Sequence, residues 1–126
     1  MVTFLFWNLN RQPRQDTVAR LVAHNSDDVL ILAENTIADE DLLGSIHRES
    51  NRRFRQSMGE SRKIDIFTHF HENALTPVLD DDSRNVTVRR LIRTSRDILL
   101  AAVHFPSKLY YSADDQSLAV RTSVSC

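Results

Sequence analysis

The sequence predicts a mixed α+β fold on two observations. Residues 1–34 contain two dense apolar runs separated by a helical pattern, which indicates strand, helix and strand in succession. From Ile64 onward, short runs rich in apolar residues are separated by turn-forming residues, as is typical of an antiparallel meander. We therefore expect one domain over residues 1–126, with a mixed sheet that begins as a βαβ unit and continues as hairpins.

The N-terminal part supplies the βαβ unit. Thr3–Leu9 is apolar and aromatic, so it predicts a buried strand. Pro13 suits the first turn of a helix, and apolar residues at helical spacing extend that helix over about residues 14–25. Val29–Ala33 predicts a second buried strand, most simply a parallel neighbour of the first.

The remaining sequence predicts a second helix and further strands. The helix is expected over Ala38–Ser57, with Leu42, Leu43, Ile46 and Phe54 on one side. Strands are expected over Ile64–Phe70, Ala74–Leu79, Val86–Ile92 and Asp97–Val103, with a turn at Asp80–Asn85. The tail Ser112–Cys126 has few apolar anchors, and its first residues are compatible with the start of a helix.

The charge balance excludes one class of function. Sixteen Lys and Arg residues oppose seventeen Asp and Glu residues, for a formal net charge of −1. This excludes a globally basic nucleic-acid-binding protein, although not a local basic patch. Arginine outnumbers lysine fourteen to two. That bias suits phosphate contacts, but genomic base composition produces it as well.

The rarer residues and the apolar runs exclude further classes. With two glycines, the chain lacks a glycine-rich phosphate-binding loop. The single cysteine, Cys126, excludes an internal disulfide and a thiolate metal cluster, so we expect a reducing, cytoplasmic setting. No apolar run approaches the roughly 18–20 residues of a membrane span, and residues 1–8 resemble a strand more than a secretory signal.

Three polar residues come directly at the ends of apolar strands. Asn8 ends the first strand, Glu34 follows the second, and His104 follows the run that ends at Val103. Strand ends are the usual place for a site in layered α/β proteins. A carboxylate there can bind Mg²⁺, an amide can orient a phosphate, and a histidine can transfer a proton.

Each of these residues also has a structural interpretation. Glu34 can be a solvated strand end or a helix cap, and Asn8 can begin a turn. His104, before Phe105 and Pro106, can be a loop residue whose ring finds its own partner.

Taken together, three segments resemble a known family. Phe6-Trp7-Asn8-Leu9-Asn10, Leu30-Ile31-Leu32-Ala33-Glu34-Asn35 and Ala101-Ala102-Val103-His104-Phe105-Pro106-Ser107 are similar, in order and spacing, to the endonuclease/exonuclease/phosphatase superfamily, which has the deoxyribonuclease-I-like fold. The resemblance implies Asn8 as an amide that orients metal or phosphate, Glu34 as the ligand of Mg²⁺ (or Mn²⁺), and His104 as an active-site group beside the phosphate. Its implied partner is nucleic acid or another phosphate ester.

The resemblance covers only part of that family's pattern. Its later Gly-Asp-x-Asn and Ser-Asp-His motifs are absent, and both belong to the second half of a domain about twice this length. We therefore expect the N-terminal half of a four-layer α/β/β/α sandwich, truncated and inactive or nearly so as an isolated chain. Half a sandwich would leave one sheet's inner face open, to be covered by the missing half or by a homo-oligomer.

Two functions remain from the sequence. One is a metal-dependent phosphoric ester hydrolase, and the other is a non-catalytic remnant or assembly module that binds a partner through its open sheet face. His69 and His71 allow a metal site on one strand face, but we expect them to be exposed strand histidines. The arginines over Arg48–Arg55 and Arg89–Arg96 suit either nucleic-acid phosphates or, more simply, a solvated charged face.

Overall fold

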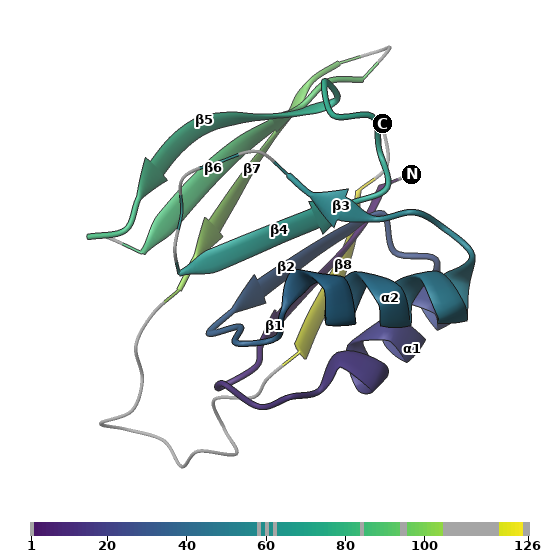
Figure 1. The fold of residues 1–126 in the computed structure, drawn as a ribbon. Helices are drawn as coiled ribbons and strands as arrows, with labels where there is room; N and C mark the ends of the chain where they lie inside the picture. Colours follow the sequence, from purple (N-terminus) through teal and green to yellow (C-terminus); the bar gives the residue numbers. More distant parts are fainter. Residues whose placement is uncertain are drawn as a thin grey trace.

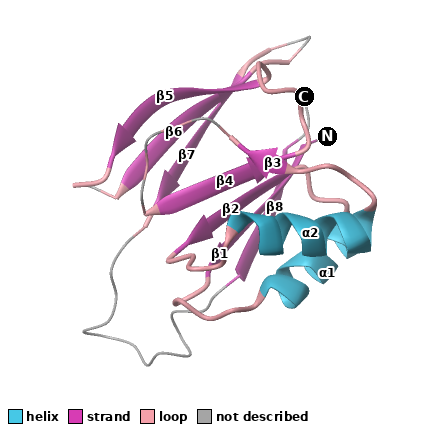
Figure 2. Ribbon diagram, viewed as in Figure 1, coloured by secondary structure: helices cyan, strands magenta, loops and turns pink. Residues whose placement is uncertain are grey.

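The computed structural model describes residues 2–57, 59, 61, 63–83, 85–93, 96–104 and 119–124, the last range by its backbone alone. Two helices cover one face of a first sheet, and a second sheet packs on its other face (Figures 1 and 2). The first sheet has the order β3 (Arg55–Gln56), β4 (Ile64–Thr68), β2 (Val29–Ala33), β1 (Val2–Asn8) and β8 (Ala119–Val124). The second has the order β5 (Leu75–Asp81), β6 (Val86–Leu91) and β7 (Ile98–Val103).

The predicted βαβ unit is confirmed. Strands β1 and β2 pair in parallel, with Phe4 opposite Val29 and Asn8 opposite Ala33, and α1 (Gln15–Asn25) connects them. Asp28 secures the start of this pair, because its carboxylate accepts the Thr3 N–H (3.0 Å) and its own N–H donates to the Thr3 carbonyl (2.8 Å).

Side chains of the first sheet point alternately to two cores, as strand geometry requires. Toward the helices, the sheet packs on both α1 and α2 (Asp39–Ser50) in a cluster of buried residues: Leu5, Trp7, Leu9, Val18, Ala19, Val22, Leu30, Leu32, Leu42, Ile46, Phe54 and Phe67. Toward the second sheet, a separate cluster comprises Val2, Phe4, Val29, Ile31, Ile64, Ile66, Leu75, Leu91 and Ala102.

The antiparallel meander is confirmed for β5, β6 and β7, but the prediction that the strand from Ile64 belongs to it is wrong. Strand β4 instead pairs with β2 in the first sheet. Ile66 faces the second sheet and Phe67 faces the helices, and both are buried. A strand with apolar side chains on both faces is stabilised most in the middle layer, because the helices cover one face of that layer and the second sheet covers the other.

The second helix is shorter than expected. It ends at Ser50, because Asn51 has a left-handed backbone (φ 61°) and its N–H closes on the His47 carbonyl (3.0 Å). Phe54 still joins the helix-side core, but from the connection that follows, and Arg55–Gln56 pair with β4. Phe54 therefore reaches the core that its spacing predicted, although the helix ends four residues before it.

The C-terminal part adds a strand that the sequence did not predict. Residues 112–118, where a helix was compatible with the sequence, lie outside the described residues, and residues 119–124 form β8, antiparallel to β1. Strand β5 extends to Asp81, so the expected turn from Asp80 begins later. No helix in the described part of the chain is long and apolar enough to cross a membrane.

The second sheet packs on the inner face of the first, but an apolar groove of about 290 Å³ remains between them, so the open face expected from the sequence is covered only in part. The groove is lined by Phe4, Phe6, Ile31, Leu100, Ala101, Ala102 and Val103. The fourth layer of the expected sandwich, an outer helical layer, is not among the described residues. Four large apolar side chains in or beside the second sheet are half or more exposed: Val78, Leu79, Ile92 and Leu99.

Candidate functional site

The parallel register brings two of the predicted site residues to one end of the first sheet. Asn8 is the last residue of β1 and lies opposite Ala33, which Glu34 follows directly. The chain after β1 folds back onto the end of β2, because the Leu9 N–H donates to the Ala33 carbonyl (3.0 Å) and the Arg11 N–H to the Glu34 carbonyl (3.0 Å). Glu34 is thereby held between two loops at the carboxyl ends of parallel strands.

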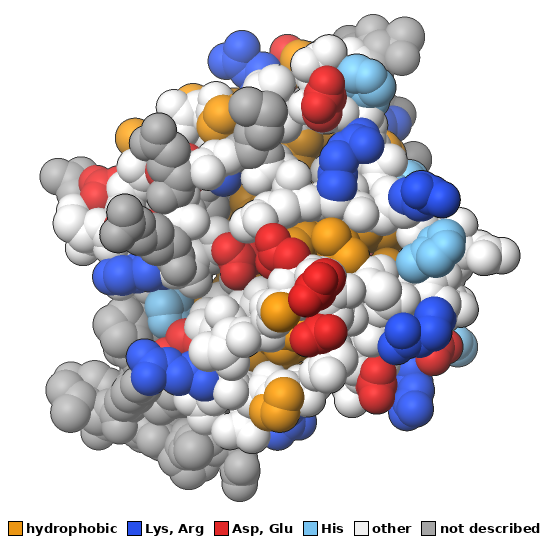
Figure 3. All heavy atoms as spheres, viewed as in Figure 1, with side chains coloured by type: hydrophobic (Ala, Val, Ile, Leu, Met, Phe, Trp, Pro, Cys, Tyr) orange, Lys and Arg blue, Asp and Glu red, His pale blue; other side chains and the backbone are white. Residues whose placement is uncertain are grey.

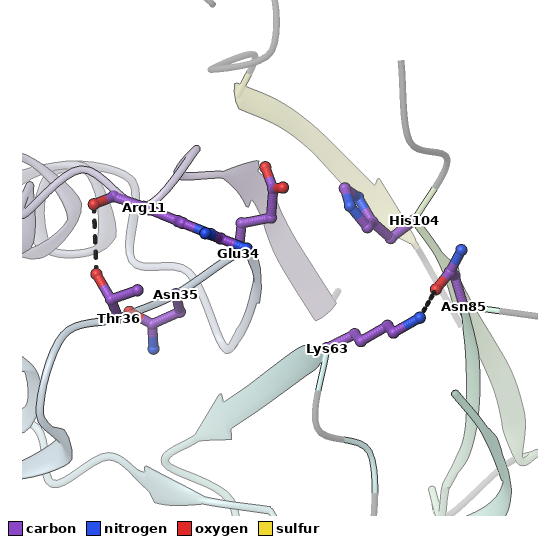
Figure 4. A pocket seen from close by; sticks show the side chains of 7 residues that line it. All are labelled: Arg11, Glu34, Asn35, Thr36, Lys63, Asn85 and His104. Carbon is purple, nitrogen blue, oxygen red and sulfur yellow. Dashed lines mark hydrogen bonds between the residues drawn. The ribbon is translucent and has the colours of Figure 1, made fainter. Parts of the chain in front are cut away.

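A pocket of about 330 Å³ opens at this end of the molecule. It is lined by Arg11, Glu34, Asn35, Thr36, Lys63, Asn85 and His104. Figure 4 shows Arg11, Glu34, Asn35 and Thr36 on one side and Lys63, Asn85 and His104 on the other. Glu34 and His104, which are seventy residues apart in the sequence, therefore share one pocket.

Asn8 has a different place. It lies at the same sheet end, but it is not among the residues that line the pocket. Its side-chain oxygen accepts the Asn10 N–H (2.9 Å), which is the bond expected of an asparagine that begins a turn. The structure therefore gives Asn8 a local role in shaping the turn that carries Arg11.

The backbone is strained around the pocket. Six residues other than glycine have positive φ in the described part of the chain, and two of them, Ser26 and Asn51, end helices. The other four lie in or beside the pocket: Asn10 (49°), Arg11 (61°), Glu34 (51°) and Asn85 (57°). Such conformations concentrate at functional sites, because the surrounding structure must enforce them.

Sequence reasoning missed five pocket residues. Asn35 and Thr36 follow Glu34 directly, and Arg11 follows the first strand closely, so proximity to a strand end was a usable signal for these. Lys63 and Asn85 come from two other loops, and no spacing in the sequence pairs them with Glu34.

Hydrogen bonds hold the walls of the pocket. Asn35 donates to Asp65 (3.1 Å) and accepts the Ile37 N–H (3.0 Å), while Thr36 donates to the Arg11 carbonyl (3.3 Å). Burial raises the pKa of Asp65, and the charge of Asp39 adds to that rise, although the bond from Asn35 opposes it.

The raised pKa of Asp65 makes its contribution to stability depend on pH. The fold favours the protonated form of Asp65, because the pKa of this carboxyl is higher in the folded chain than in the unfolded chain. The stability contributed by this group is therefore complete at pH values below its ordinary pKa, and it is lost as the pH rises through the folded-state pKa. We expect Asp65→Asn, whose amide oxygen can still accept from Asn35, to be more stable than the wild type at about pH 7 and not at about pH 3. Urea unfolding at both pH values checks this, with the exposed Asp97→Asn as control; an equal advantage at both would contradict it.

The oxygen donors of the pocket fit a hard divalent cation in part. Glu34 supplies a carboxylate, and its Oε2 atom is buried. Mg²⁺ is usually held by one or two carboxylates together with water and substrate phosphate, so one carboxylate beside a phosphate site suits it. No group of three or more His, Cys, Asp or Glu side chains that could hold a metal occurs among the residues that the structure describes.

The expectation that His69 is an exposed strand histidine is wrong. His69 follows β4 and is partly buried, with its Nε2 2.8 Å from Asp28 Oδ1 and 2.8 Å from Arg52 Nη1. Its ring also lies 5.5 Å from that of Phe54. His71 is exposed, as expected, but outside a strand.

Most described arginines of the two clusters are exposed, as expected of a solvated charged face, but two of them have intramolecular acidic partners. Arg52 pairs with Asp28 and donates to the Asp27 carbonyl (3.0 Å). Arg89 is only 2% exposed and pairs with Asp80 (2.9 Å). On the face shown in Figure 3, acidic side chains lie near the centre and basic side chains lie around them. The first turn of α2 carries three acidic residues, Asp39, Glu40 and Asp41.

Comparisons with known proteins bear on the fold. No protein-family model matches the chain. No curated protein matches its sequence. A solved endonuclease/exonuclease/phosphatase family protein from Leptotrichia buccalis C-1013-b matches with a TM-score of 0.59 and 14% identity, over 84% of this chain and 54% of that one.

A second solved structure agrees. It is the endonuclease domain of TRAS1, a telomere-specific non-LTR retrotransposon, and it matches with a TM-score of 0.56 and 18% identity, over 86% of this chain and 50% of that one. The chain thus spans about half the length of the solved structures it matches. It has the deoxyribonuclease-I-like fold of the endonuclease/exonuclease/phosphatase proteins, as a partial domain, and the resemblance found in the sequence is confirmed at the level of the fold.

Proposed function

We propose that this chain carries part of the site of a metal-dependent phosphoric ester hydrolase, which acts on nucleic acid or another phosphate ester. The observation that carries the proposal is the shared pocket of Glu34 and His104. Arg11 and Lys63 line the same pocket, so one carboxylate is surrounded by basic groups. A cation at the carboxylate and a phosphate among the basic groups would complement this distribution of charge.

Glu34 would hold Mg²⁺ or Mn²⁺, with Asn8 shaping the adjoining turn. When bound, the cation supplies charge that offsets the negative charge developing on the phosphate. Arg11 and Lys63 would bind the non-bridging phosphate oxygens from opposite walls of the pocket. His104 would lie beside the ester oxygen that leaves, where a protonated ring can donate to it.

Hydrolysis also needs a group that accepts a proton from the attacking water. The water oxygen forms a bond to phosphorus, the phosphorus–oxygen bond to the leaving group breaks, and the leaving oxygen takes a proton. Glu34 is the one carboxylate among the described residues that line the pocket. If Glu34 holds the cation, its carboxylate is not available to take the water's proton, and we propose weak or no turnover by these 126 residues alone.

The experiment is a titration of the chain with inorganic phosphate, with and without Mg²⁺, followed by the NMR signals of His104 and Lys63. We expect both signals to shift on phosphate binding, and the affinity to rise at least severalfold with Mg²⁺, because the cation offsets the charge of Glu34. Phosphate affinity that is the same with Mg²⁺ as with a chelator would contradict a metal-dependent site.

Arg11→Gly is expected to change stability and binding in opposite directions. Glycine adopts the left-handed backbone of residue 11 without the penalty of a side chain, so the free energy of unfolding should rise by about 0.5–1 kcal/mol. Losing the guanidinium should weaken phosphate binding about three- to tenfold at low salt, and less at high salt. Urea unfolding and phosphate titration measure the two effects.

Ser26→Gly is the matched control for Arg11→Gly. Ser26 is exposed and has a similar φ of 52°, but it ends α1 away from the pocket. It should gain similar stability and keep the phosphate affinity of the wild type. If it also lost phosphate affinity, the effect of Arg11→Gly would not be assigned to the pocket.

The second candidate function is that of an assembly module, and the surface of the second sheet favours it. Val78, Leu79 and Leu99 are each more than half exposed, and such apolar side chains are stabilised when a partner covers them. This function predicts a concentration-dependent oligomer in analytical ultracentrifugation that Leu99→Glu dissociates. A monomer at every concentration would exclude self-assembly.

A further inference from the structure

Asn85 connects two pocket residues, Lys63 and His104, that belong to different sheets. Its side-chain oxygen accepts a hydrogen bond from Lys63 Nζ (2.8 Å), at the start of β4 in the first sheet. Its backbone carbonyl accepts the N–H of His104 (2.9 Å), at the end of β7 in the second sheet. Figure 4 shows the three residues along one side of the pocket.

The conformation of Asn85 makes both bonds possible. It lies in the turn between β5 and β6 with φ at 57°, a left-handed value that asparagine adopts more readily than most residues. Asn85 is half-buried, whereas Lys63 is exposed. The long Lys63 side chain would sample many rotamers in solvent, and a fixed acceptor at its end restricts them.

The connection before β4 holds the backbone of Lys63 in place. Ser61 donates to Asp82 on the side of the second sheet (3.1 Å) and accepts the Ile64 N–H (3.2 Å). Earlier in the same connection, a Cβ at Gly59 would collide with the guanidinium of Arg89 on β6, so Gly59 lies directly against the second sheet. The described neighbours of Lys63 thus contact both sheets.

We propose that Asn85 is the positioning residue of the phosphate site, and that it fixes the Lys63 ammonium as a specificity-determining cation on the wall that carries His104. This inference rests on the proposed function and deepens it. With Arg11 on the opposite wall, the fixed ammonium gives the pocket basic groups on two sides of a bound phosphate. The site then favours a phosphate with further negative charge close to it, such as the backbone of a nucleic acid, over an isolated monoanionic ester.

The test compares inorganic phosphate binding to the full chain in Asn85→Gly, Lys63→Met and the double variant. Glycine keeps the left-handed backbone and the carbonyl that binds His104, and removes only the acceptor of Lys63. We expect Asn85→Gly and Lys63→Met each to weaken phosphate binding about three- to tenfold, and the double variant to bind no more weakly than Lys63→Met, because Asn85 acts through Lys63.

The matched control is Asn51→Gly. Asn51 has the same side chain and a similar φ of 61°, but it ends α2 and does not line the pocket. It should bind phosphate as the wild type does. Equal loss in Asn51→Gly, or full additivity in the double variant, would overturn the positioning role.

Substrate discrimination completes the test. The wild type should bind thymidine 3′,5′-bisphosphate more tightly than dimethyl phosphate, and Asn85→Gly should reduce that preference. If the wild type binds phosphate and Asn85→Gly binds it equally well, the inference fails while the proposed function stands. If the wild type does not bind phosphate at all, the proposed function and the inference fail together.

Discussion

Glu34→Gln should remove the Mg²⁺ dependence of phosphate binding. Glutamine keeps the size and shape of the side chain but lacks the negative charge that attracts a hard cation. Loss of an outer hydrogen bond to a metal ligand already lowers metal affinity about 10–100-fold, so replacing the carboxylate itself should lower Mg²⁺ affinity more than tenfold. Isothermal titration with Mg²⁺, at a saturating phosphate concentration, measures the change.

Glu49→Gln is the matched control for that variant. Glu49 is an exposed carboxylate in the last turn of α2, and it does not line the pocket. Its replacement should leave Mg²⁺ affinity unchanged. Equal Mg²⁺ affinity in the wild type and in Glu34→Gln would remove Glu34 as the proposed ligand, even if phosphate still bound to the basic groups.

Phe67→Ala should destabilise the fold by about 3–5 kcal/mol, the usual range for truncation of a buried aromatic side chain. Phe67 is fully buried in the core between the helices and the first sheet. It pairs with Leu30 of β2 and with Gln56 of β3, so its strand connects the edge of the sheet to the strand that ends beside Glu34. Because the free energy of unfolding of a native protein is only about 5–15 kcal/mol, the variant should lose much of its stability.

Urea unfolding measures this change, and two further variants keep the test decisive. Leu79→Ala removes an apolar side chain that is 52% exposed and should cost well under half as much. Phe67→Leu retains most of the buried volume and should lose about 1–1.5 kcal/mol, which remains measurable if the alanine variant does not fold. A loss for Phe67→Leu no greater than that for Leu79→Ala would contradict a core role for Phe67.

Local patterns in the sequence predicted most of the elements, since they are encoded over short distances. The apolar run of Val29–Ala33 and the helical spacing before it needed no tertiary information, and the parallel pairing followed from the short crossover. The second helix was overextended, because Phe54 has the correct spacing for a helix face but packs into the same core from a connection.

The candidate site was predictable only where it coincides with strand ends. Glu34 and His104 follow apolar strands, and the structure places both in one pocket; their roles there stay predictions. Asn8 ends a strand too, but its side chain bonds within its own turn. The same sequence feature therefore has two outcomes, because the backbone after each strand decides where the side chain lies.

The sequence by itself determined the βαβ unit, the hairpins and the positions of the strand-end residues, because these depend on the spacing of apolar residues along the chain. Only the tertiary structure decided that β4 joins the first sheet, that Arg89 pairs with Asp80, that His69 lies against Asp28 and Arg52, and that Lys63 and Asn85 meet at the pocket. Those contacts join segments that are distant in the sequence or belong to different sheets. Their formation depends on how the layers pack, and the spacing of residues within a single element carries no record of that packing.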